Sequence, residues 1–312
     1  MKCHNCDRKA VITLQHGSVC EMHFLNYFED KVFKTIKKYQ LIKPNDSLCV
    51  AASGGKDSLT ILYLTKKYLK ENELENKLFA LAVDEGIKDY REHTLIDLKE
   101  FCKKYEIELR TVSFKEEFNS TLDEAKSKIN DKKPCNICGV WRRYLLNKYA
   151  REENATKVIT GHNLDDEAQV IIMNIFKANT GLAAQLGPVT GIKEHDLFVQ
   201  RVKPLYFCTE KETKLYSILK KFQVNFAECP NAQEGYRIQI RDMLNDFEQK
   251  YPGTKQGIIN SFLEILPLLK NKAAEKENGK LKQCQECGEP ATKNICNACK
   301  IAEELKCTVI QD

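Results

Sequence analysis

Hydrophobic residues follow two different periods along the first two thirds of the chain. Short apolar runs of the kind found in buried strands occupy residues 47–52, 78–83, 107–112 and 157–160. Apolar residues recur at helical spacing over residues 59–69, 91–105, 140–153 and 164–177. Strands that alternate with helices in this way predict a doubly wound, mostly parallel α/β sheet.

The segments on either side of this region have other patterns. Before it, residues 26–38 alternate aromatic and aliphatic side chains with lysines at helical spacing, which predicts a basic amphipathic helix. After it, residues 180–196 are rich in glycine and irregular, as expected of a loop over an active site. Further helices are predicted over 209–222, 238–250 and 254–269, and a polar linker over 270–282.

Composition limits the classes of protein that fit this pattern. The 312 residues are enough for about two domains, and 49 Lys and Arg against 44 Asp and Glu give a net charge of +5. This small excess permits a nucleic-acid partner without requiring one. The longest strongly apolar run, residues 170–176, is far shorter than the ~20 residues of a membrane span. The N-terminus lacks an apolar signal core, so we expect a cytoplasmic protein without membrane association.

The unusual feature of the composition is its 14 cysteines, seven of which fall into two sets near the ends of the chain. Without an export signal, such spacings indicate metal binding rather than disulfides. Pairs of ligands two residues apart suit tetrahedral Zn²⁺, and each set supplies four ligands with no open position. The sequence therefore predicts two structural zinc sites. Their ligands are Cys3, Cys6, Cys20 and His23 at the start, and Cys284, Cys287, Cys296 and Cys299 near the end.

A third set of cysteines is incomplete. Cys135 and Cys138 form a pair in the middle of the chain, and Cys229 lies in an E-C-P-N segment 91 residues beyond Cys138. Three thiolates would hold three irons of a [4Fe–4S] cluster and leave the fourth iron open. A third zinc site, a persulfide-carrying redox pair and buried inert thiols are alternatives. The spacing alone does not distinguish among them.

A glycine-rich loop follows the first predicted strand and opens the next helix. Two glycines let the backbone approach an anion closely, the helix N-terminus presents N–H groups to it, and Lys56 adds a positive charge. The loop is not a Walker A motif, because Asp57 follows the lysine and Val50 stands where the first glycine is required. We expect it to bind the phosphates of a nucleotide through Ala51, Ala52, Ser53, Gly54, Gly55, Lys56, Asp57 and Ser58.

An acidic motif occupies the equivalent position after the fourth predicted strand. In T-G-H-N-L-D-D-E-A, Asn163 or Asp165 can cap the following helix, which accounts for one of the two aspartates but not both. The carboxylate of Asp165 or Asp166 that does not cap the helix would be well placed for Mg²⁺ on ATP, as would Asp57. His162 is expected to be a hydrogen-bonding structural residue.

These motifs together are similar to those of a known family. S-G-G-K-D-S resembles the pyrophosphatase loop of enzymes that convert ATP to AMP and diphosphate. With the N-terminal Cys/His set, P-C-x-x-C-G, G-H-N-x-D-D, E-C-P-N and the C-terminal Cys₄ set in this order, the chain resembles the TtuA-like tRNA-uridine 2-thiolation enzymes and their archaeal and cytosolic wobble-uridine relatives. The resemblance covers nearly the whole chain. It implies a PP-loop core, Rossmann-like and similar to the adenine nucleotide alpha hydrolases, with a small zinc-binding module at each end.

The resemblance also implies roles for individual residues. Cys135, Cys138 and Cys229 would bind the [4Fe–4S] cluster, and Asp165 or Asp166 would act in catalysis or with magnesium. The zinc modules would help to grip tRNA. The nucleotide would be lined by the loop already named and by Ala82, Val83, Asp84, Arg142 and Gly161.

One departure concerns the residue four positions after the second cluster cysteine. TtuA-like members carry lysine there, whereas this chain carries Arg142, which does not deprotonate and therefore cannot act as a base. Lys56, Asp57 and Arg142 are the other expected catalytic residues. The segments around residues 83–91 and 138–143 look more like the wobble-uridine branch, but the Cys-x₂-His ending of the first set resembles the TtuA branch.

The reaction implied by the resemblance is ATP-dependent synthesis of 2-thiouridine in tRNA. The uridine C2 oxygen would be adenylated, and a cluster-bound hydrosulfide would then displace AMP, with the wobble uridine as the preferred target. The T-loop uridine and a cluster-free ATP ligase or persulfide sulfurtransferase are alternatives, as is a zinc-containing RNA-binding module without enzymatic activity. The expected partners are tRNA, a sulfur donor (sulfide or a thiocarboxylated ubiquitin-like carrier) and a second copy of the chain.

We therefore expect five segments and several contacts with tRNA phosphates. Lysines at 31–43, Arg142, Arg143 and Lys148 are candidates for those contacts. The segments are an N-terminal zinc finger (1–30), a basic linker helix (31–46), a PP-loop ATP-binding catalytic domain (47–207), a helical extension with the third cluster cysteine (208–272) and a C-terminal zinc finger (280–312).

Overall fold

The core of the molecule is a five-stranded parallel sheet. The computed structural model describes residues 1–14, 16–128, 133–192, 196–227, 229–232, 235–276 and 282–307. The strand order is β5-β4-β3-β6-β7, and all four pairings are parallel, so the predicted sheet is confirmed. The strands are β3 (Leu48–Ala51), β4 (Leu78–Asp84), β5 (Glu108–Ser113), β6 (Lys157–Ile159) and β7 (Gln200–Val202). Of these, β7 was not predicted from the sequence.

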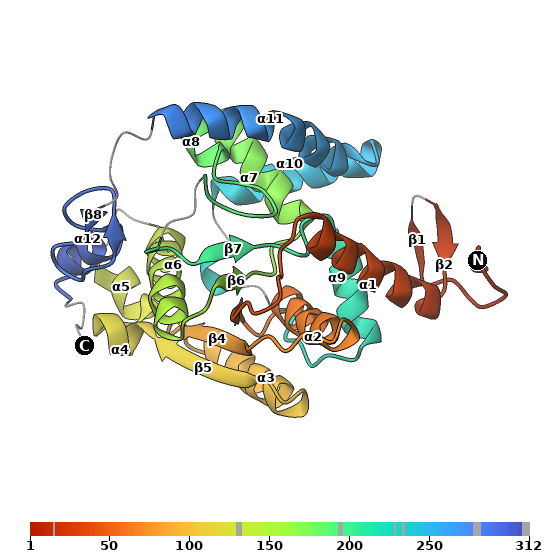
Figure 1. Ribbon diagram of the computed structural model, residues 1–312, viewed down its shortest axis with the longest axis horizontal. Helices are drawn as coiled ribbons and strands as arrows, with labels where there is room; N and C mark the ends of the chain where they lie inside the picture. Colours follow the sequence, from red (N-terminus) through yellow and green to blue (C-terminus); the bar gives the residue numbers. More distant parts are fainter. Residues whose placement is uncertain are drawn as a thin grey trace.

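Helices cover both faces of this sheet (Figure 1). Side chains alternate across a strand, and in β4 the small residues Ala80 and Ala82 face one core while Phe79 and Leu81 face the other. The first face packs against α1 (Glu21–Lys38), α2 (Lys56–Glu71), α3 (Arg91–Lys104) and α9 (Glu210–Leu219). The second packs against α4 (Phe114–Phe118), α5 (Leu122–Lys128) and α6 (Pro134–Glu152).

A separate layer of helices covers the end of the sheet nearest to β7 (Figure 1). It has its own apolar core and consists of α7 (Leu164–Phe176), α8 (Thr180–Ala183), α10 (Tyr236–Lys250) and α11 (Thr254–Lys276). The segment expected to be an irregular loop contains α8, and its Val189 pairs with Val202. The expected linker at 270–282 begins inside α11, and residues 277–281 lie outside the described residues.

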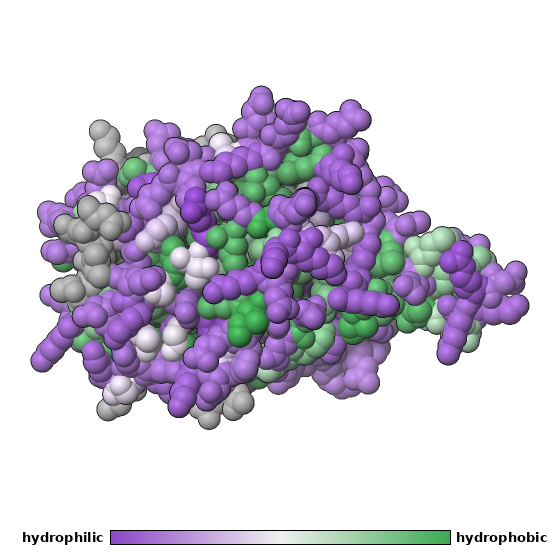
Figure 2. Space-filling model, turned by 90° about the horizontal axis from the view of Figure 1, so that it is seen from below, coloured by the Kyte–Doolittle hydropathy of each residue, from purple (hydrophilic) through white to green (hydrophobic). Residues whose placement is uncertain are grey.

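The two cysteine-rich modules lie at opposite ends of the molecule (Figures 1 and 2). The N-terminal module contains the hairpin β1 (Ile12–Leu14) and β2 (Gly17–Val19), and the boundary expected at residue 30 falls within α1. The C-terminal module contains β8 (Lys282–Gln283), β9 (Pro290–Ala291) and α12 (Asn297–Glu304), and it shares an apolar core with α6. Residues 308–312 of the expected C-terminal finger lie outside the described residues.

All fourteen cysteines are free thiols in this structure. Cys49, Cys102 and Cys208 are buried, and desolvation raises the pKa of the first two to about 12 and about 11. These thiols pack as small apolar groups. In the described part of the chain, no helix combines the length and apolarity that crossing a bilayer requires.

Candidate active site and metal centres

The glycine-rich loop lies at the point where the strand order reverses. The chain passes from β3 outward through β4 to β5, and then returns to the other side of β3 to form β6 and β7. The loops after β3 and β6 therefore diverge at the carboxyl edge of the sheet, where open α/β sheets bind ligands. These two loops are the glycine-rich loop and the acidic motif that the sequence singled out.

Two glycines in these loops are required by close packing. Gly54 has φ +82°, and a Cβ there would lie 2.2 Å from the carbonyl oxygen of Thr94 in α3. A Cβ on Gly161 would lie 2.9 Å from the carbonyl carbon of Asp57, so the β6 loop rests on the first turn of α2. A larger residue at position 54 would push the phosphate loop away from α3, and one at position 161 would push the β6 loop away from the start of α2.

Buried Arg91 fastens the phosphate loop to the end of β4. Its guanidinium donates to the carbonyl oxygens of Ser53 and Val83, with Nη2 2.6 Å from the latter, and Nε lies 2.9 Å from Oε2 of buried Glu85. This brings the expected nucleotide-lining strand end, Ala82 to Asp84, beside the loop. Within the loop, the Ser58 hydroxyl accepts a 3.2 Å hydrogen bond from the Ser53 amide and donates to the Gly55 carbonyl.

Lys56 and Asp57, the first two residues of α2, form an ion pair at the end of this loop. The Lys56 ammonium lies 2.9 Å from Oδ2 of Asp57 and 3.1 Å from Oε1 of Glu210, at the start of α9. Desolvation lowers the pKa of Lys56, but these two carboxylates outweigh it and raise the pKa above its usual value. The other oxygen of Asp57 accepts a 3.1 Å bond from the Asn163 amide of the β6 loop. The lysine is therefore held as a cation where phosphates are expected.

The two neighbouring aspartates of the acidic motif have different surroundings. Asp165 is buried, forms an ion pair with Lys255 of α11, and accepts a 2.7 Å bond from the backbone N–H of Glu210. Asp166 completes a capping box with Asn163, and its other oxygen lies 2.7 Å from Nη2 of Arg237 in α10. Desolvation raises the pKa of Asp166 to about 6, although the charge of Arg237 opposes this shift. Both aspartates thus attach the outer helices to the active-site loop.

The buried Lys255–Asp165 pair yields a prediction on stability. Replacing Lys255 by Met should lower the free energy of unfolding by about 3–5 kcal/mol, because the Asp165 carboxylate would be left buried without its cation. Denaturant titration followed by circular dichroism measures the change. Lys250→Met is the matched control, since its pair with Asp246 is exposed and should contribute at most about 0.5 kcal/mol. Equal stabilities of the two variants would contradict the prediction.

The third cysteine set converges on the N-terminus of α6. Cys135 and Cys138 lie on its first turns, and the Cys135 thiol donates a 3.2 Å hydrogen bond to the Asn231 carbonyl, two residues beyond Cys229. Desolvation raises the pKa of the Cys138 thiol to about 12, and Cys229 and Cys135 act in the same direction. Segments far apart in the sequence are thereby brought together at this helix end, and binding of one cluster by Cys135, Cys138 and Cys229 stays a prediction.

The spacing of these thiols differs from that of the terminal sets. Among the described residues, ligand atoms within 4.8 Å of one another occur in the two terminal sets but not in Cys135, Cys138 and Cys229. This spacing is wider than the roughly 3.8 Å between the thiolates of one tetrahedral zinc. It is compatible with a cluster in which each thiolate binds a different iron.

Arg142 and Glu85 lie beside this three-thiol site. The Arg142 guanidinium is 3.7 Å from Oε1 of Glu85, whose other oxygen binds Arg91 and thereby the phosphate loop. The charge of Arg142 acts on Cys138 and Cys229, and also on His162 in the β6 loop. Arg142 therefore lies in the electrostatic neighbourhood of both expected centres. The sequence analysis included Glu85 in the segment that resembles the wobble-uridine branch but gave this residue no role of its own.

The terminal sets have the geometry of closed metal sites. In the N-terminal set, Nδ1 of His23 lies 3.4 Å from the sulfurs of Cys3 and Cys20 and 3.7 Å from that of Cys6. In the C-terminal set, two sulfur pairs are 3.8 Å apart, Cys284 with Cys299 and Cys287 with Cys296. These separations fit the edges of a tetrahedron of ligands around Zn²⁺.

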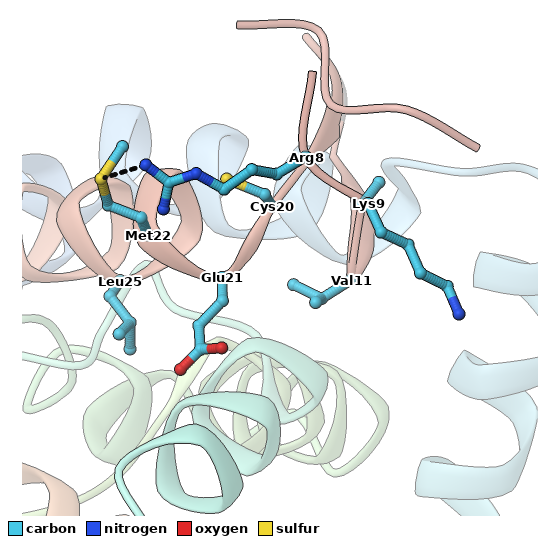
Figure 3. A pocket seen from close by; sticks show the side chains of 8 residues that line it. Arg8, Lys9, Val11, Cys20, Glu21, Met22 and Leu25 are labelled. Carbon is cyan, nitrogen blue, oxygen red and sulfur yellow. Dashed lines mark hydrogen bonds between the residues drawn. The ribbon is translucent and has the colours of Figure 1, made fainter. Parts of the chain in front are cut away.

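An open cavity of 620 Å³ lies against the N-terminal module, away from the phosphate loop (Figure 3). Arg8 crosses its rim and donates to the Met22 sulfur at 3.5 Å, while Lys9 extends from the other side. Val11, Glu21 and Leu25 complete the wall. The charged side chains of its wall are therefore Arg8, Lys9 and Glu21.

The basic residues expected to contact tRNA divide into two groups. Lys31 lies 2.9 Å from Glu212, and Lys148 lies 3.2 Å from buried Glu117. These two lysines are engaged within the protein. In contrast, Lys34, Lys37, Lys38, Lys43 and Arg143 are exposed.

A family model described as a PP-loop domain matches residues 25–246, which is more than half of the chain. The tRNA-5-methyluridine(54) 2-sulfurtransferase of Pyrococcus horikoshii is 35% identical over 302 residues, 96% of this chain and 93% of that relative. The chain belongs to the PP-loop family of tRNA 2-thiolation proteins. The resemblance drawn from the motifs is thereby confirmed.

Two further relatives of this family are similar over almost the full length. The tRNA 2-thiolation protein NcsA of Haloferax volcanii is 30% identical, with 98% of this chain and 99% of the relative covered. The solved structure of the U34-tRNA thiolase NcsA of Methanococcus maripaludis with its [4Fe–4S] cluster is 30% identical and superposes with a TM-score of 0.82. This superposition covers 100% of this chain and 98% of the other, which confirms the expected fold.

Proposed function

We propose that this chain catalyses ATP-dependent 2-thiolation of a tRNA uridine, releasing AMP and diphosphate. The observation that supports this proposal most strongly is a chain of polar contacts, Ser53–Arg91–Glu85–Arg142, which runs from the phosphate loop toward the three-thiol site and whose middle members, Arg91 and Glu85, are buried. An enzyme that activates a carbonyl oxygen with ATP and replaces it with sulfur needs both centres beside one substrate. The similar proteins named as tRNA sulfurtransferases support this proposal.

The residues at the three-thiol site fit a [4Fe–4S] cluster. Cys135 and Cys138 are one helical turn apart, Cys229 approaches from another segment, and the thiols are too far apart for one zinc. The cluster would be held by these three side chains. When bound, it supplies an iron with an open position at which sulfide is held as a nucleophile.

The chain's own side chains account for activation of the uridine. Loop N–H groups and Lys56 would bind the β- and γ-phosphates and stabilise the diphosphate as the C2 oxygen attacks the α-phosphate. Arg142 would stabilise charge on the α-phosphate and then on AMP as it leaves. Asp57 and the partly exposed Asp166 are the carboxylates that would bind Mg²⁺. Buried Asp165 would position them through its bonds to Lys255 and α9.

We propose the wobble uridine as the target. Support comes from the near-complete superposition on the U34-tRNA thiolase and from the segments around residues 83–91 and 138–143. The 35% identity to a 5-methyluridine(54) 2-sulfurtransferase and the Cys-x₂-His ending favour the T-loop instead. Mass spectrometry of tRNA nucleosides from a deletion strain separates these targets. We expect 2-thiouridine to be lost from the wobble position alone. A loss confined to the T-loop would reject the wobble uridine as the target.

The reaction itself is tested with anaerobically purified protein. We expect bound iron and acid-labile sulfide, and 2-thiouridine formation that requires ATP, sulfide and tRNA together. Cys229→Ser should lose thiolation and iron while it retains ATP binding, whereas Cys102→Ser, a buried thiol remote from the site, should behave as native. A fully active protein without iron would contradict the cluster chemistry.

The remaining partners follow from the same proposal. Both zinc modules would grip the tRNA, with Arg8 and Lys9 on the rim of the N-terminal cavity as phosphate contacts. Sulfur would arrive as sulfide or from a thiocarboxylated carrier protein, and the chain would act as a homodimer. The cytoplasm is the proposed location, because similar proteins of Laccaria bicolor and Danio rerio are named cytoplasmic tRNA 2-thiolation proteins.

A further inference from the structure

Three arginines lie close together on α6 and the edge strand β7, two elements that adjoin in Figure 1. Arg142 and Arg143 are consecutive residues of α6, and Nη2 of Arg201 in β7 donates a 3.3 Å hydrogen bond to the Arg143 carbonyl. The Arg143 guanidinium folds back over Gly139, where an added Cβ would lie 3.3 Å from its Nη1. Gly139 therefore leaves the space that this side chain occupies. We call Arg142, Arg143 and Arg201 the arginine cluster.

The arginine cluster has an excess of positive charge. Within the described ranges, no carboxylate lies within 4.0 Å of Arg143 or Arg201, and Arg142 has only the 3.7 Å contact with Glu85. Desolvation, followed by the charge of neighbouring arginines, lowers the pKa of Arg143 and brings that of Arg201 to about 10. Neighbouring cations without counterions repel one another and raise the free energy of the unbound protein, and a bound anion would relieve this repulsion.

Other cations nearby form ion pairs with carboxylates, so the excess of positive charge is confined to the arginine cluster. Lys203, two residues after Arg201, lies 2.8 Å from Glu167, and Arg237 lies 2.7 Å from Asp166. The carboxylates of this region, Glu167 and Asp166, thus pair with other cations and not with the arginine cluster. An anion with several acceptor oxygens matches the planar, fork-like donors of guanidinium groups.

The position of the cluster favours a phosphate of RNA over one of ATP. β6 separates β7 from β3, so Arg201 starts about 10 Å from the strand that leads into the phosphate loop. The side chains of Arg142 and Arg143 are exposed, and a macromolecule can reach them. The cluster also adjoins Cys138, where the sulfur would be delivered.

We propose that the arginine cluster binds a phosphate group of the RNA strand next to the uridine to be modified. This inference rests on the proposed function, which supplies the RNA, and it identifies Arg201 as a substrate-binding residue that sequence analysis did not single out. Binding one phosphate beside the three-thiol site would fix the position of the uridine relative to the incoming sulfur.

The test measures binding of labelled tRNA by fluorescence anisotropy over a series of salt concentrations. Arg201→Gln and Arg143→Gln should each weaken tRNA binding by about tenfold. They should also lower the slope of log Kd against log salt by about 0.7 for one lost single-strand phosphate contact. Arg201→Lys, which retains the charge, should restore the slope. ATP binding, measured by equilibrium dialysis, should stay at the native level.

Arg110→Gln is the matched control, since its guanidinium pairs with Glu108 and Glu153 on β5, at the opposite edge of the sheet. Unchanged tRNA affinity in the cluster variants would overturn the proposal. Weakened ATP binding would also overturn it, because the phosphate would then belong to the nucleotide. If Arg201→Gln has a lower melting temperature, Arg143→Gln decides the result. Native protein that binds tRNA through the cluster but forms no 2-thiouridine would reject the proposed function alone.

Discussion

Lys56→Ala is expected to lower the rate of tRNA thiolation by about a hundredfold or more while the fold stays intact. Its ammonium is held at the mouth of the phosphate loop by Asp57 and Glu210, which raise its pKa and keep it protonated. Removing one preorganised donor from a developing negative charge typically costs 10²–10³-fold in rate. Single-turnover formation of 2-thiouridine with saturating ATP measures the loss.

Stability should change little in Lys56→Ala, because Glu210 is half exposed and becomes hydrated when its partner is lost. Lys67→Ala provides the matched control: it lies on the same helix, also pairs with two glutamates, and lies remote from the loop. This control should thiolate at the native rate. Thiolation by Lys56→Ala at the native rate would contradict the assigned role of the loop.

The central strands were predictable because burial on both faces leaves a continuous apolar run. In β3 and β4, every residue from Leu48 to Val50 and from Phe79 to Val83 is buried. Hydrophobic periodicity did not predict β7, the strand at one edge of the sheet. It has only three residues, and two of them, Gln200 and Arg201, are polar because one side of the strand has no partner in the five-stranded sheet. A short polar edge strand has no period to detect.

The start of α6 was predicted six residues too late for a related reason. Periodicity indicated a helix from residue 140, whereas the structure begins it at Pro134, which fits the first helical position because it needs no N–H partner. Of the residues before 140, Ile137 is buried in the apolar core, whereas Cys135 and Asn136 are exposed, so one apolar side chain is too few for a helical period. Residues that serve a functional site at a helix end do not follow the apolar period, so the first turn of such a helix is not predicted from the sequence.

The candidate site could be predicted only where its residues share a local motif. The loop containing Lys56 and the motif containing Asp165 were found because spacing and strand–helix order carry the signal. Glu210, Arg201 and Lys255 reach the same region from separate elements, by tertiary packing alone. A single charged residue in an amphipathic helix or a short edge strand looks like any solvated position, so no sequence signal identifies these partners.

The C-terminal cysteine set is proposed to hold zinc, and removing one of its ligands is expected to disrupt the three-thiol site, even though the two sets share no ligand. The C-terminal module packs on α6: Nε1 of Trp141 donates a 3.3 Å bond to the Ala298 carbonyl, and Glu289 lies 2.9 Å from Arg151. A structural zinc contributes on the order of 10 kcal/mol to folding, so the module should unfold without it. The helix that carries Cys135 and Cys138 would then lose one wall of its core.

Cys296→Ser isolates this effect, because serine can keep the cap that Cys296 provides to α12 while removing a metal ligand. Trp141 is the only tryptophan of the chain and is fully buried, so its emission should shift to longer wavelength as the module leaves α6. Iron content of the anaerobic protein should fall in parallel, and thiolation with it.

The matched control is Cys20→Ser, which removes the third ligand of the other set at the corresponding position before α1. It should release its zinc and weaken the N-terminal module, yet leave both the emission of Trp141 and the iron content at native values, because that module lies at the opposite end of the molecule (Figure 1). Native emission and full iron in Cys296→Ser would show that α6 holds the three-thiol site without the C-terminal module. A loss of iron in both variants would instead indicate a general loss of stability, and the specific support inferred from Trp141 and Glu289 would be wrong.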